Sequence, residues 1–204
     1  RDYANLENLS ISKKGPADLV SSADKKAEGI LVADLRKARP KYGFLLEEEG
    51  TIEGTDTSNR WVIDPLDGTI NFLHAIPHFA ISIALERDGE FYAGVVFEPV
   101  HDEMFWAEKG QGAFLNGRPL RVSARQHLED SIISTSIPFK GLKNHALFLR
   151  QLEAVMANVS GVRRAGASAL DLAYLAAGRY DGFWENGLYP WDIGAGTVLV
   201  REAG

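Results

Sequence analysis

The chain is organised around residues 61–72, which read Trp61-Val62-Ile63-Asp64-Pro65-Leu66-Asp67-Gly68-Thr69-Ile70-Asn71-Phe72. Its first three residues favour a β-strand, and a proline disfavours helical backbone in the residue before it, so Asp64 is expected to be extended at the strand's end. Gly68 permits backbone conformations that are closed to other residues, and with Thr69 it can open a short helix whose free amides suit an anion. The carboxylates of Asp64 and Asp67 are therefore expected to face an anion-binding turn.

Two carboxylates so close together favour a cation between them. Like charges at short range do not both stay ionised cheaply unless a cation lies between them, and hard oxygen ligands select magnesium, manganese or calcium. We expect magnesium. The Asp-x-x-Asp spacing alone fits an ordinary turn equally well, because Asp-Pro and Asp-Gly pairs are common in turns.

The string from Asp64 to Phe72 closely resembles a signature of the inositol monophosphatase family, and a second family signature recurs at Trp191-Asp192-Ile193-Gly194-Ala195-Gly196. The run Lys14-Gly15-Pro16-Ala17-Asp18-Leu19-Val20 looks like the family's bacterial branch of inositol-1-monophosphatases of the extragenic-suppressor type. The resemblance spans nearly the whole chain. It implies a lithium-sensitive, magnesium-dependent phosphatase, commonly a homodimer, with a layered α/β sandwich of alternating helices and mixed sheets. Periodicity alone indicates only an α/β or α+β fold.

Composition indicates one globular unit that can bury a sizeable core, because the 204 residues are 45% hydrophobic and 25% charged. We expect a single catalytic domain over residues 1–204, with halves of about 1–125 and 126–204. A net charge of -6 argues against direct nucleic-acid binding. The absence of cysteine excludes a disulfide framework and fits the cytoplasm.

No apolar run approaches the roughly 20 residues of a membrane span, and no signal-peptide pattern opens the chain. We therefore expect a soluble protein without a membrane partner. Members of the resembled family carry further segments at both ends, so the chain looks trimmed at both termini.

Hydrophobic spacing predicts helices and strands on either side of the central stretch. A helix is expected over 22–38, with an apolar face of Ala27, Ile30, Leu31, Leu35 and Ala38, and a second over 145–158, with a buried stripe of Leu149, Leu152, Val155 and Met156. Strands are expected at 44–46, 76–85, 91–97, 104–107 and 131–135. Residues 50–59 are rich in Thr, Asp, Ser and Gly and predict a mobile loop.

An acidic triplet, Glu47-Glu48-Glu49, follows the strand at 44–46. Such a triplet is usually exposed to solvent, but the carboxyl ends of neighbouring strands meet at one sheet edge, where α/β proteins bind ligands. Glu47 is the expected metal ligand beside Asp64. Leu46 replaces a glycine that is common in the family, so Glu48 remains the alternative.

Asp24 admits two interpretations at the start of the first predicted helix. Its spacing from Ser21 fits a capping box. The family resemblance implies instead that Asp24 and Thr69 together polarise the attacking water. Both roles are compatible with one side chain.

Three segments of the second half also match family positions. Asp192 can be an ordinary helix N-cap, whereas the resemblance implies a metal ligand. Glu185 can be an exposed loop acid, whereas the resemblance implies a hydrogen bond to a polyol hydroxyl. The turn Gly166-Ala167-Ser168 matches the substrate side of the family's pocket, and helix packing explains its small residues equally well.

The resulting hypothesis is hydrolysis of myo-inositol monophosphate, or a related polyol or sugar phosphate, with two or three magnesium ions. The expected metal ligands are the side chains of Glu47, Asp64, Asp67 and Asp192 and the carbonyl of Leu66. The expected substrate contacts are Asp67, Gly68, Thr69, Gly166, Ala167, Ser168, Glu185 and Asp192. A water activated by Thr69 and Asp24, with Glu47 as the third catalytic residue, attacks phosphorus directly, because the motifs offer no covalent nucleophile.

Other substrates of the same superfamily remain open, namely fructose bisphosphate, histidinol phosphate and nucleoside bisphosphates. Glu185 argues for a neutral polyol, because its charge would repel a second phosphate. A different kind of function is also open: the protein could be a regulatory protein that binds the transcription machinery, as some bacterial relatives do.

Overall fold

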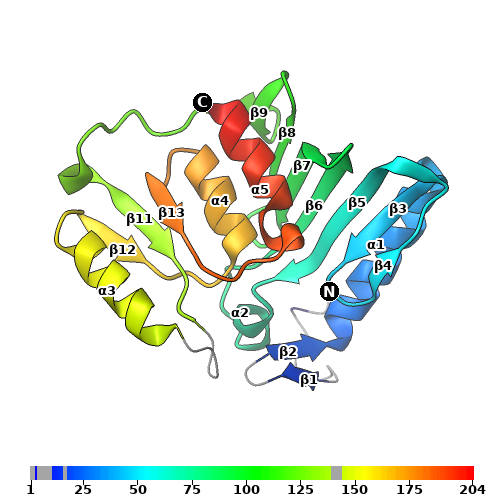
Figure 1. Ribbon diagram of the computed structural model, residues 1–204, viewed down its shortest axis with the longest axis horizontal. Helices are drawn as coiled ribbons and strands as arrows, with labels where there is room; N and C mark the ends of the chain where they lie inside the picture. The colour runs from blue at the N-terminus through cyan, green and yellow to red at the C-terminus, as the bar shows by residue number, and fades with distance from the viewer. Residues whose placement is uncertain (1–2, 4–10, 16–17, 139–143) are drawn as a thin grey trace.

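The computed structural model describes residue 3 and residues 11–15, 18–138 and 144–204, and the side chains of residues 3, 22–138 and 144–204. Its layers follow one another as α1 (Ser22–Ala38), a large mixed sheet, the pair α4 (Ser168–Ala176) and α5 (Pro190–Ala203), a small parallel sheet, and α3 (His145–Met156) on the outside (Figure 1). This arrangement confirms the layered α/β sandwich.

The large sheet has eight strands in the order β10-β9-β8-β7-β6-β5-β3-β4. Their bounds are β3 Tyr42–Leu46, β4 Gly50–Ile52, β5 Asp56–Asp67, β6 Ala80–Arg87, β7 Glu90–Glu98, β8 Glu103–Glu108, β9 Gly112–Leu115 and β10 Arg118–Pro119. β3 and β5 run parallel, and the other neighbouring pairs are antiparallel. The carboxyl ends of β3 and β5 therefore lie at the same edge.

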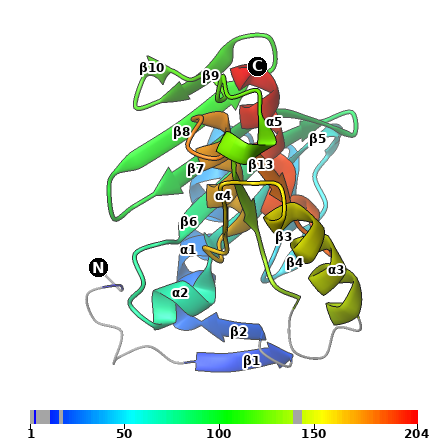
Figure 2. The ribbon, with the colours of Figure 1, turned by 90° about the vertical axis from the view of Figure 1, so that its left-hand side faces the viewer.

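The small sheet consists of three parallel strands in the order β12 (Gly161–Arg163), β11 (Ile132–Thr135) and β13 (Gly182–Trp184). The remaining described elements are the antiparallel pair β1 (Ile11–Gly15) and β2 (Asp18–Ser21), the short helix α2 (Thr69–Leu73) and the 3-10 turn η3 (Leu128–Asp130). Figure 2 shows β1 and β2 next to α2, at the end of the molecule opposite β9 and β10.

The second half of β5, from Val62 to Asp67, is buried on both faces because helices cover both sides of the sheet there. Ile63 packs with Phe44 and Leu46 against the α1 side, whereas Val62 belongs to the main core with residues of α4 and α5. Successive strand residues point to opposite faces, so an uninterrupted apolar run is what such a strand requires. The central stretch is therefore held from both sides up to its carboxylates.

Small residues let α5 lie close to its neighbours. A Cβ added to Gly94 of β7 would lie 2.6 Å from the Cα of Ala195, and one added to Gly196 would lie 2.4 Å from the Cβ of Leu172 on α4. The glycines of the second signature thus have a packing role in addition to any role in chemistry.

The structure corrects three local expectations. Residues 50–59 are mostly not a loop, because β4 pairs with β3 and β5 begins at Asp56. The predicted stripe of α3 is wrong: Leu149 and Met156 are 61% and 55% exposed, and Phe148 is the buried residue. On α1, Ile30 is 55% exposed, and the buried residues are Ala23, Asp24 and Glu28.

The side chain of Ser21 and residues 16–17 of the third resembled run lie outside the described part, so the capping box stays a prediction. Within the described residues, the structure has no helix long and apolar enough to cross a membrane.

Candidate active site

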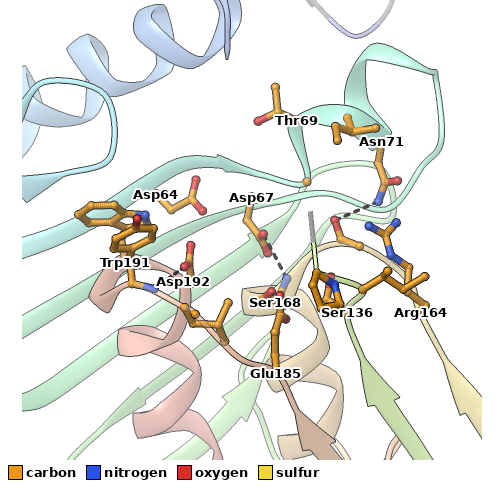
Figure 3. Close-up of a pocket in the computed structure, with 18 of the residues that line it drawn as sticks. Asp64, Asp67, Thr69, Asn71, Ser136, Arg164, Ser168, Glu185, Trp191 and Asp192 are labelled. Carbon is orange, nitrogen blue, oxygen red and sulfur yellow. Dashed lines mark hydrogen bonds between the residues drawn. The ribbon is translucent and has the colours of Figure 1, made fainter. Parts of the chain in front are cut away.

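A cavity of about 500 Å³ opens where the large sheet, α4, α5 and the small sheet meet (Figure 3). One side carries four predicted metal ligands, Glu47, Asp64, Asp67 and Asp192. The other side carries Ser136, Arg164, Ser168 and Glu185. The fold therefore brings together acids that are up to 145 positions apart in the sequence (192 minus 47).

The parallel pairing of β3 and β5 places Glu47 beside Asp64. Leu46 lies opposite Ile63, and the amide of Glu47 donates a 3.2 Å hydrogen bond to the Ile63 carbonyl. Glu47 lines the cavity, whereas Glu48 is not among the lining residues. Asp64 is 2% exposed, and its Oδ1 accepts a 2.9 Å bond from the amide of Leu66, which fixes the turn that follows.

Gly68 makes the turn toward Thr69 possible for two reasons. Its φ of 89° lies in the left-handed region, and a Cβ there would lie 3.1 Å from both the Ala167 Cβ and the His78 carbonyl oxygen. Thr69 then places its hydroxyl 3.0 Å from Oδ1 of Asp24 and 3.1 Å from the Leu66 carbonyl. Asp24 has no exposed surface. The structure thus pairs the two residues predicted to activate water.

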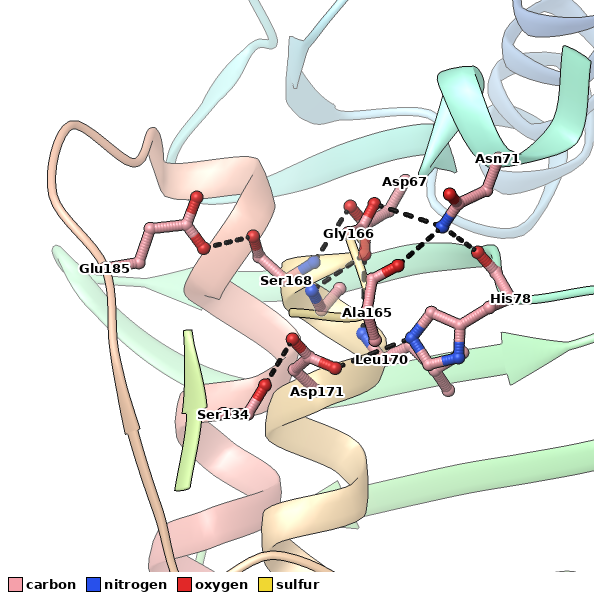
Figure 4. A network of polar contacts seen from close by, with 11 residues as sticks. Asp67, Asn71, His78, Ser134, Ala165, Gly166, Ser168, Leu170, Asp171 and Glu185 are labelled. Carbon is pink, nitrogen blue, oxygen red and sulfur yellow. Dashed lines mark hydrogen bonds and ion pairs between the residues drawn. The ribbon is translucent and has the colours of Figure 1, made fainter. Parts of the chain in front are cut away.

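Asp67 is tied to the start of α4. Its Oδ1 accepts a 3.1 Å bond from the amide of Ser168, and its Oδ2 accepts bonds of 2.8 and 3.3 Å from the amides of Ala169 and Leu170 (Figure 4). These amides have no partner within the helix, and the positive end of the helix dipole favours an anion. The second acid of the central stretch therefore also positions the turn at Gly166–Ser168.

Asp192 is not the N-cap of α5, which corrects that alternative. The helix begins at Pro190 with Tyr189 as N-cap, and Oδ2 of Asp192 accepts a 2.6 Å bond from the amide of Tyr189. Proline is favoured in the first turn of a helix, so the N-cap of α5 lies three residues earlier than the aspartate suggested (192 minus 189). Asp192 thus stabilises the helix start from the third helical position and still lines the cavity.

The acids repel one another. Burial raises the pKa of Asp64 well above its usual value, and the charges of Glu47, Asp67 and Asp192 raise it further. Burial and the charge of Asp192 likewise raise the pKa of Asp67. Burial is also the main reason that the pKa of Asp192 is raised to about 6. The folded protein therefore resists ionisation of these groups unless positive charge enters the cavity.

The donor set fits a hard divalent cation, because every candidate ligand is an oxygen and the mutual repulsion of Asp64, Asp67 and Asp192 favours positive charge between them. As the side chains stand, no group of three or more His, Cys, Asp or Glu in the described residues meets the geometry of a metal site. Asp67 and Asp192 each accept hydrogen bonds from backbone amides, which occupy some of their lone pairs. A carboxylate has about four lone-pair sites, so both retain capacity for a cation.

The opposite side of the cavity centres on Glu185. Its Oε2 accepts a 2.7 Å bond from the hydroxyl of Ser168, and Ser136 also donates to it. Burial raises the pKa of Glu185, while these two hydroxyls lower it. Gly166 lines the cavity as expected, but Ala167 is not a lining residue and is buried in the main core.

Asn71, Ser136 and Arg164 are among the lining residues to which the sequence analysis assigned no role. The amide nitrogen of Asn71 donates to the carbonyls of His78 at 2.7 Å and Ala165 at 2.9 Å, which joins α2 to the segment before α4 (Figure 4). A polar asparagine between the apolar residues Ile70 and Phe72 could have indicated from the sequence that this side chain makes a specific polar contact. Ser136 and Arg164 follow strands of the small sheet, and no local pattern marks them.

The sequence profile described as the inositol monophosphatase family matches residues 1–204. The chain is 58% identical over its full length to the inositol-1-monophosphatase of Mesorhizobium japonicum, of which it covers 77%. It is 45% identical over its full length to the Nus factor SuhB of Escherichia coli, of which it covers 76%. The crystal structure of the extragenic suppressor protein suhB from Bartonella henselae superimposes with a TM-score of 0.97 at 58% identity, covering 100% of this chain and 78% of that one.

Proposed function

The chain belongs to the inositol monophosphatase family, and from this premise we propose how its residues hydrolyse the phosphate ester of myo-inositol or a related polyol. It is a phosphomonoesterase, and its products are the free alcohol and inorganic phosphate. The observation that carries the assignment of the site is the set of four buried or half-buried acids around one cavity that also contains the Gly68-Thr69 turn.

In this proposal the side chains of Glu47, Asp64, Asp67 and Asp192 and the carbonyl of Leu66 hold magnesium. When bound, magnesium neutralises the phosphate and lowers the pKa of water, which makes a nucleophile available at neutral pH. The raised pKa values of Asp64 and Asp67 support this assignment, because they show how strongly the fold disfavours uncompensated charge at these positions.

Asp24 and Thr69 orient and deprotonate the attacking water. The Thr69 hydroxyl donates its proton to Oδ1 of Asp24, which turns the lone pairs of Thr69 Oγ1 toward the cavity as acceptors for a water proton. Asp24 is buried, so its negative charge acts on this hydroxyl with little screening by solvent. The amides of Gly68 and Thr69 hold the phosphate oxygens in this scheme.

The hydroxyl face of the substrate meets Glu185, Ser168 and Gly166. A carboxylate that accepts hydrogen bonds from serine hydroxyls is also a good acceptor for the hydroxyls of a polyol. Its charge disfavours a second phosphate at the same place, so a monophosphate is preferred to fructose bisphosphate or a nucleoside bisphosphate.

Phosphate release from myo-inositol 1-phosphate, measured with magnesium and with EDTA, tests this function. We expect turnover with magnesium, inhibition by lithium and no turnover in EDTA. Full activity in EDTA would refute the metal mechanism. A parallel panel of histidinol phosphate, fructose bisphosphate and a nucleoside bisphosphate ranks the alternative substrates.

A second candidate role, in transcription, is favoured by the relatives named Nus factor SuhB. We propose that such a role would use the surface of a homodimer and be independent of phosphate release. A variant that lacks phosphatase activity but keeps the fold separates the two roles. If it restores a deletion strain as well as the wild type does, the transcription role is the physiological one.

A further inference from the structure

Helix α1 carries two buried carboxylates one turn apart. Asp24 and Glu28 are separated by four residues, so they lie on the same face of the helix, and they are 0% and 1% exposed. Asp24 contacts Thr69, as described above. Glu28 faces a different segment, the acidic triplet that follows β3.

Both oxygens of Glu28 accept hydrogen bonds from consecutive backbone amides. Oε2 accepts a 3.0 Å bond from the amide of Glu48, and Oε1 accepts a 3.1 Å bond from the amide of Glu49. The preceding amide, that of Glu47, donates to the carbonyl of Ile63 on β5. Three successive amides are therefore fixed, and together they set the direction in which the Glu47 side chain leaves the backbone.

Burying the carboxylate of Glu28 to hold a loop costs free energy, because the charged group loses its contact with water. Burial of an acid disfavours its charge, and here the acid also faces two further acidic residues, Glu48 and Glu49. Its charge-assisted bonds of 3.0 and 3.1 Å hold two consecutive amides at once, which a neutral side chain in this position does not reproduce. Such rigidity matters where the geometry of a ligand matters, and Glu47 enters the same cavity as Asp64.

We propose that Glu28 is a positioning residue that fixes Glu47 for magnesium binding through the backbone of residues 47–49. Glu28 does not itself reach the cavity. This role rests on the proposed function, because it requires that Glu47 binds magnesium. Helix α1 then serves as one rigid support for two parts of the site, with Asp24 on the turn at Thr69 and Glu28 on the acidic triplet.

The test is magnesium binding by the substrate-free protein, measured by isothermal titration calorimetry with magnesium chloride, for wild type and Glu28→Gln. Glutamine has the same shape, but its amide group donates and cannot accept a bond from the second backbone amide. Loss of groups that orient metal ligands costs about tenfold to a hundredfold in metal affinity. We expect that loss of affinity, together with a matching rise in the magnesium concentration needed for half-maximal phosphatase activity. The kcat at saturating magnesium should stay within about threefold of wild type.

Glu98 offers a matched control. It is also fully buried, and its two oxygens accept bonds from consecutive amides, those of Val100 at 2.7 Å and His101 at 2.8 Å. It is not a lining residue of the acidic cavity. Glu98→Gln should lower the melting temperature as Glu28→Gln does, but leave magnesium affinity unchanged.

Hydrogen exchange of the amides of Glu48 and Glu49 in EDTA adds a readout that is independent of metal and substrate. These amides should exchange faster in Glu28→Gln and at the wild-type rate in Glu98→Gln. If Glu28→Gln does not fold, Glu28→Asp, which keeps the charge but is one methylene shorter, is measured in the same way.

Wild-type magnesium affinity in a folded Glu28 variant would overturn the positioning role while leaving the phosphatase assignment intact. A wild-type protein that binds no magnesium would overturn both. Equal losses of magnesium affinity in the Glu28 and Glu98 variants would show that the effect is general destabilisation.

Discussion

Glu185 is the residue on which substrate preference is expected to depend most directly. Removing its charge in Glu185→Gln weakens a charge-assisted hydrogen bond to the polyol, a loss of roughly 1.5 to 3 kcal/mol. The kcat/KM for myo-inositol 1-phosphate should therefore fall about tenfold to a hundredfold, while the magnesium dependence stays unchanged. Steady-state kinetics at several magnesium concentrations measures both quantities. A shifted magnesium optimum with unchanged selectivity would contradict the assignment.

Ser168 holds the Glu185 carboxylate in place by its 2.7 Å hydrogen bond. In Ser168→Ala this donor is lost, at a cost of about 0.5 to 1.5 kcal/mol, so KM should rise about twofold to tenfold with little change in kcat. Ser168→Thr keeps the hydroxyl and should restore most of the affinity. If the alanine variant has a wild-type KM, the serine does not contribute to substrate recognition.

Asp192 tests whether the two signatures form one site. Asp192→Asn keeps an oxygen acceptor for the Tyr189 amide but removes the charge. If Asp192 binds magnesium, turnover should fall at least about a hundredfold, whereas a purely structural role predicts little change. Loss of mutual repulsion should leave the metal-free protein equally or more stable. Assays in saturating magnesium and melts in EDTA distinguish these cases, and near wild-type turnover would reject Asp192 as a ligand.

At the level of single residues, the sequence predicts side chains inside the motifs better than those outside them. The position of Glu47 could be predicted because it directly follows a strand, and the partnership of Asp24 with Thr69 because both residues match positions of the resembled family. Glu28 and Ser136 could not, because their roles depend on contacts with Glu48, Glu49 and Glu185 that only the tertiary fold creates.

Among the secondary-structure elements, the packing of α5 on β7 depends on the absence of a side chain at Gly94. In Gly94→Ala the added Cβ would lie 2.6 Å from the Cα of Ala195, so the helix has to move away from the sheet. Overpacking of this kind typically costs about 1 to 3 kcal/mol, and the melting temperature should fall accordingly. Thermal melts followed by circular dichroism measure the change.

Gly29 is the matched control for this prediction, since it lies inside α1 with no atom within 4 Å of its added Cβ. Gly29→Ala should leave stability unchanged or raise it by about 0.5 to 1 kcal/mol, because alanine is the better helix former. Equal melting temperatures for wild type and Gly94→Ala would show that the contact between α5 and β7 relaxes without cost.

Helix positions were predicted from periodicity with more success than their buried faces. The bounds of α1 and α3 agree closely with the expected segments, but Leu149, Met156 and Ile30 are largely exposed. The spacing of apolar residues along the sequence indicates which residues share a face of the helix. Their burial also depends on how much of that face a neighbouring layer covers. The small sheet contacts α3 from one side and buries mainly Phe148.

At the scale of the whole molecule, the acidic cavity makes stability depend on pH and on metal together. The pKa values of Asp64, Asp67 and Asp192 are raised in the folded state, so the folded protein binds more protons than the unfolded one. The contribution of these three acids to the free energy of unfolding is therefore fully present below about pH 4. It is lost as the pH rises through their pKa values in the folded state, and for Asp192 that pKa is about 6.

In EDTA, the melting temperature should consequently fall between pH 5 and pH 7, after allowance for the remaining titrating groups. Saturating magnesium should abolish most of this fall, because the cation compensates the charges, and its stabilising effect should grow with pH. Asp192→Asn supplies the comparison and should show a shallower fall in EDTA. A profile in EDTA that is as flat as the one in magnesium would contradict the proposed repulsion.

The two sides of the cavity belong to different layers, and this division allows the enzyme's chemistry and its selectivity to evolve separately. Among the four candidate ligands, Glu47 follows β3 and both Asp64 and Asp67 lie at the end of β5 in the large sheet, whereas the lining residues Ser136, Arg164 and Glu185 follow strands of the small one. Substitutions in the loops after β11, β12 and β13 can therefore alter which alcohol is accepted without moving the acids that act on the phosphate, provided that they spare the amides near Ser168 and Tyr189 that bond Asp67 and Asp192. Gene duplication followed by drift in those loops alone would give enzymes with one hydrolytic apparatus and different substrates, and directed evolution can exploit the same separation.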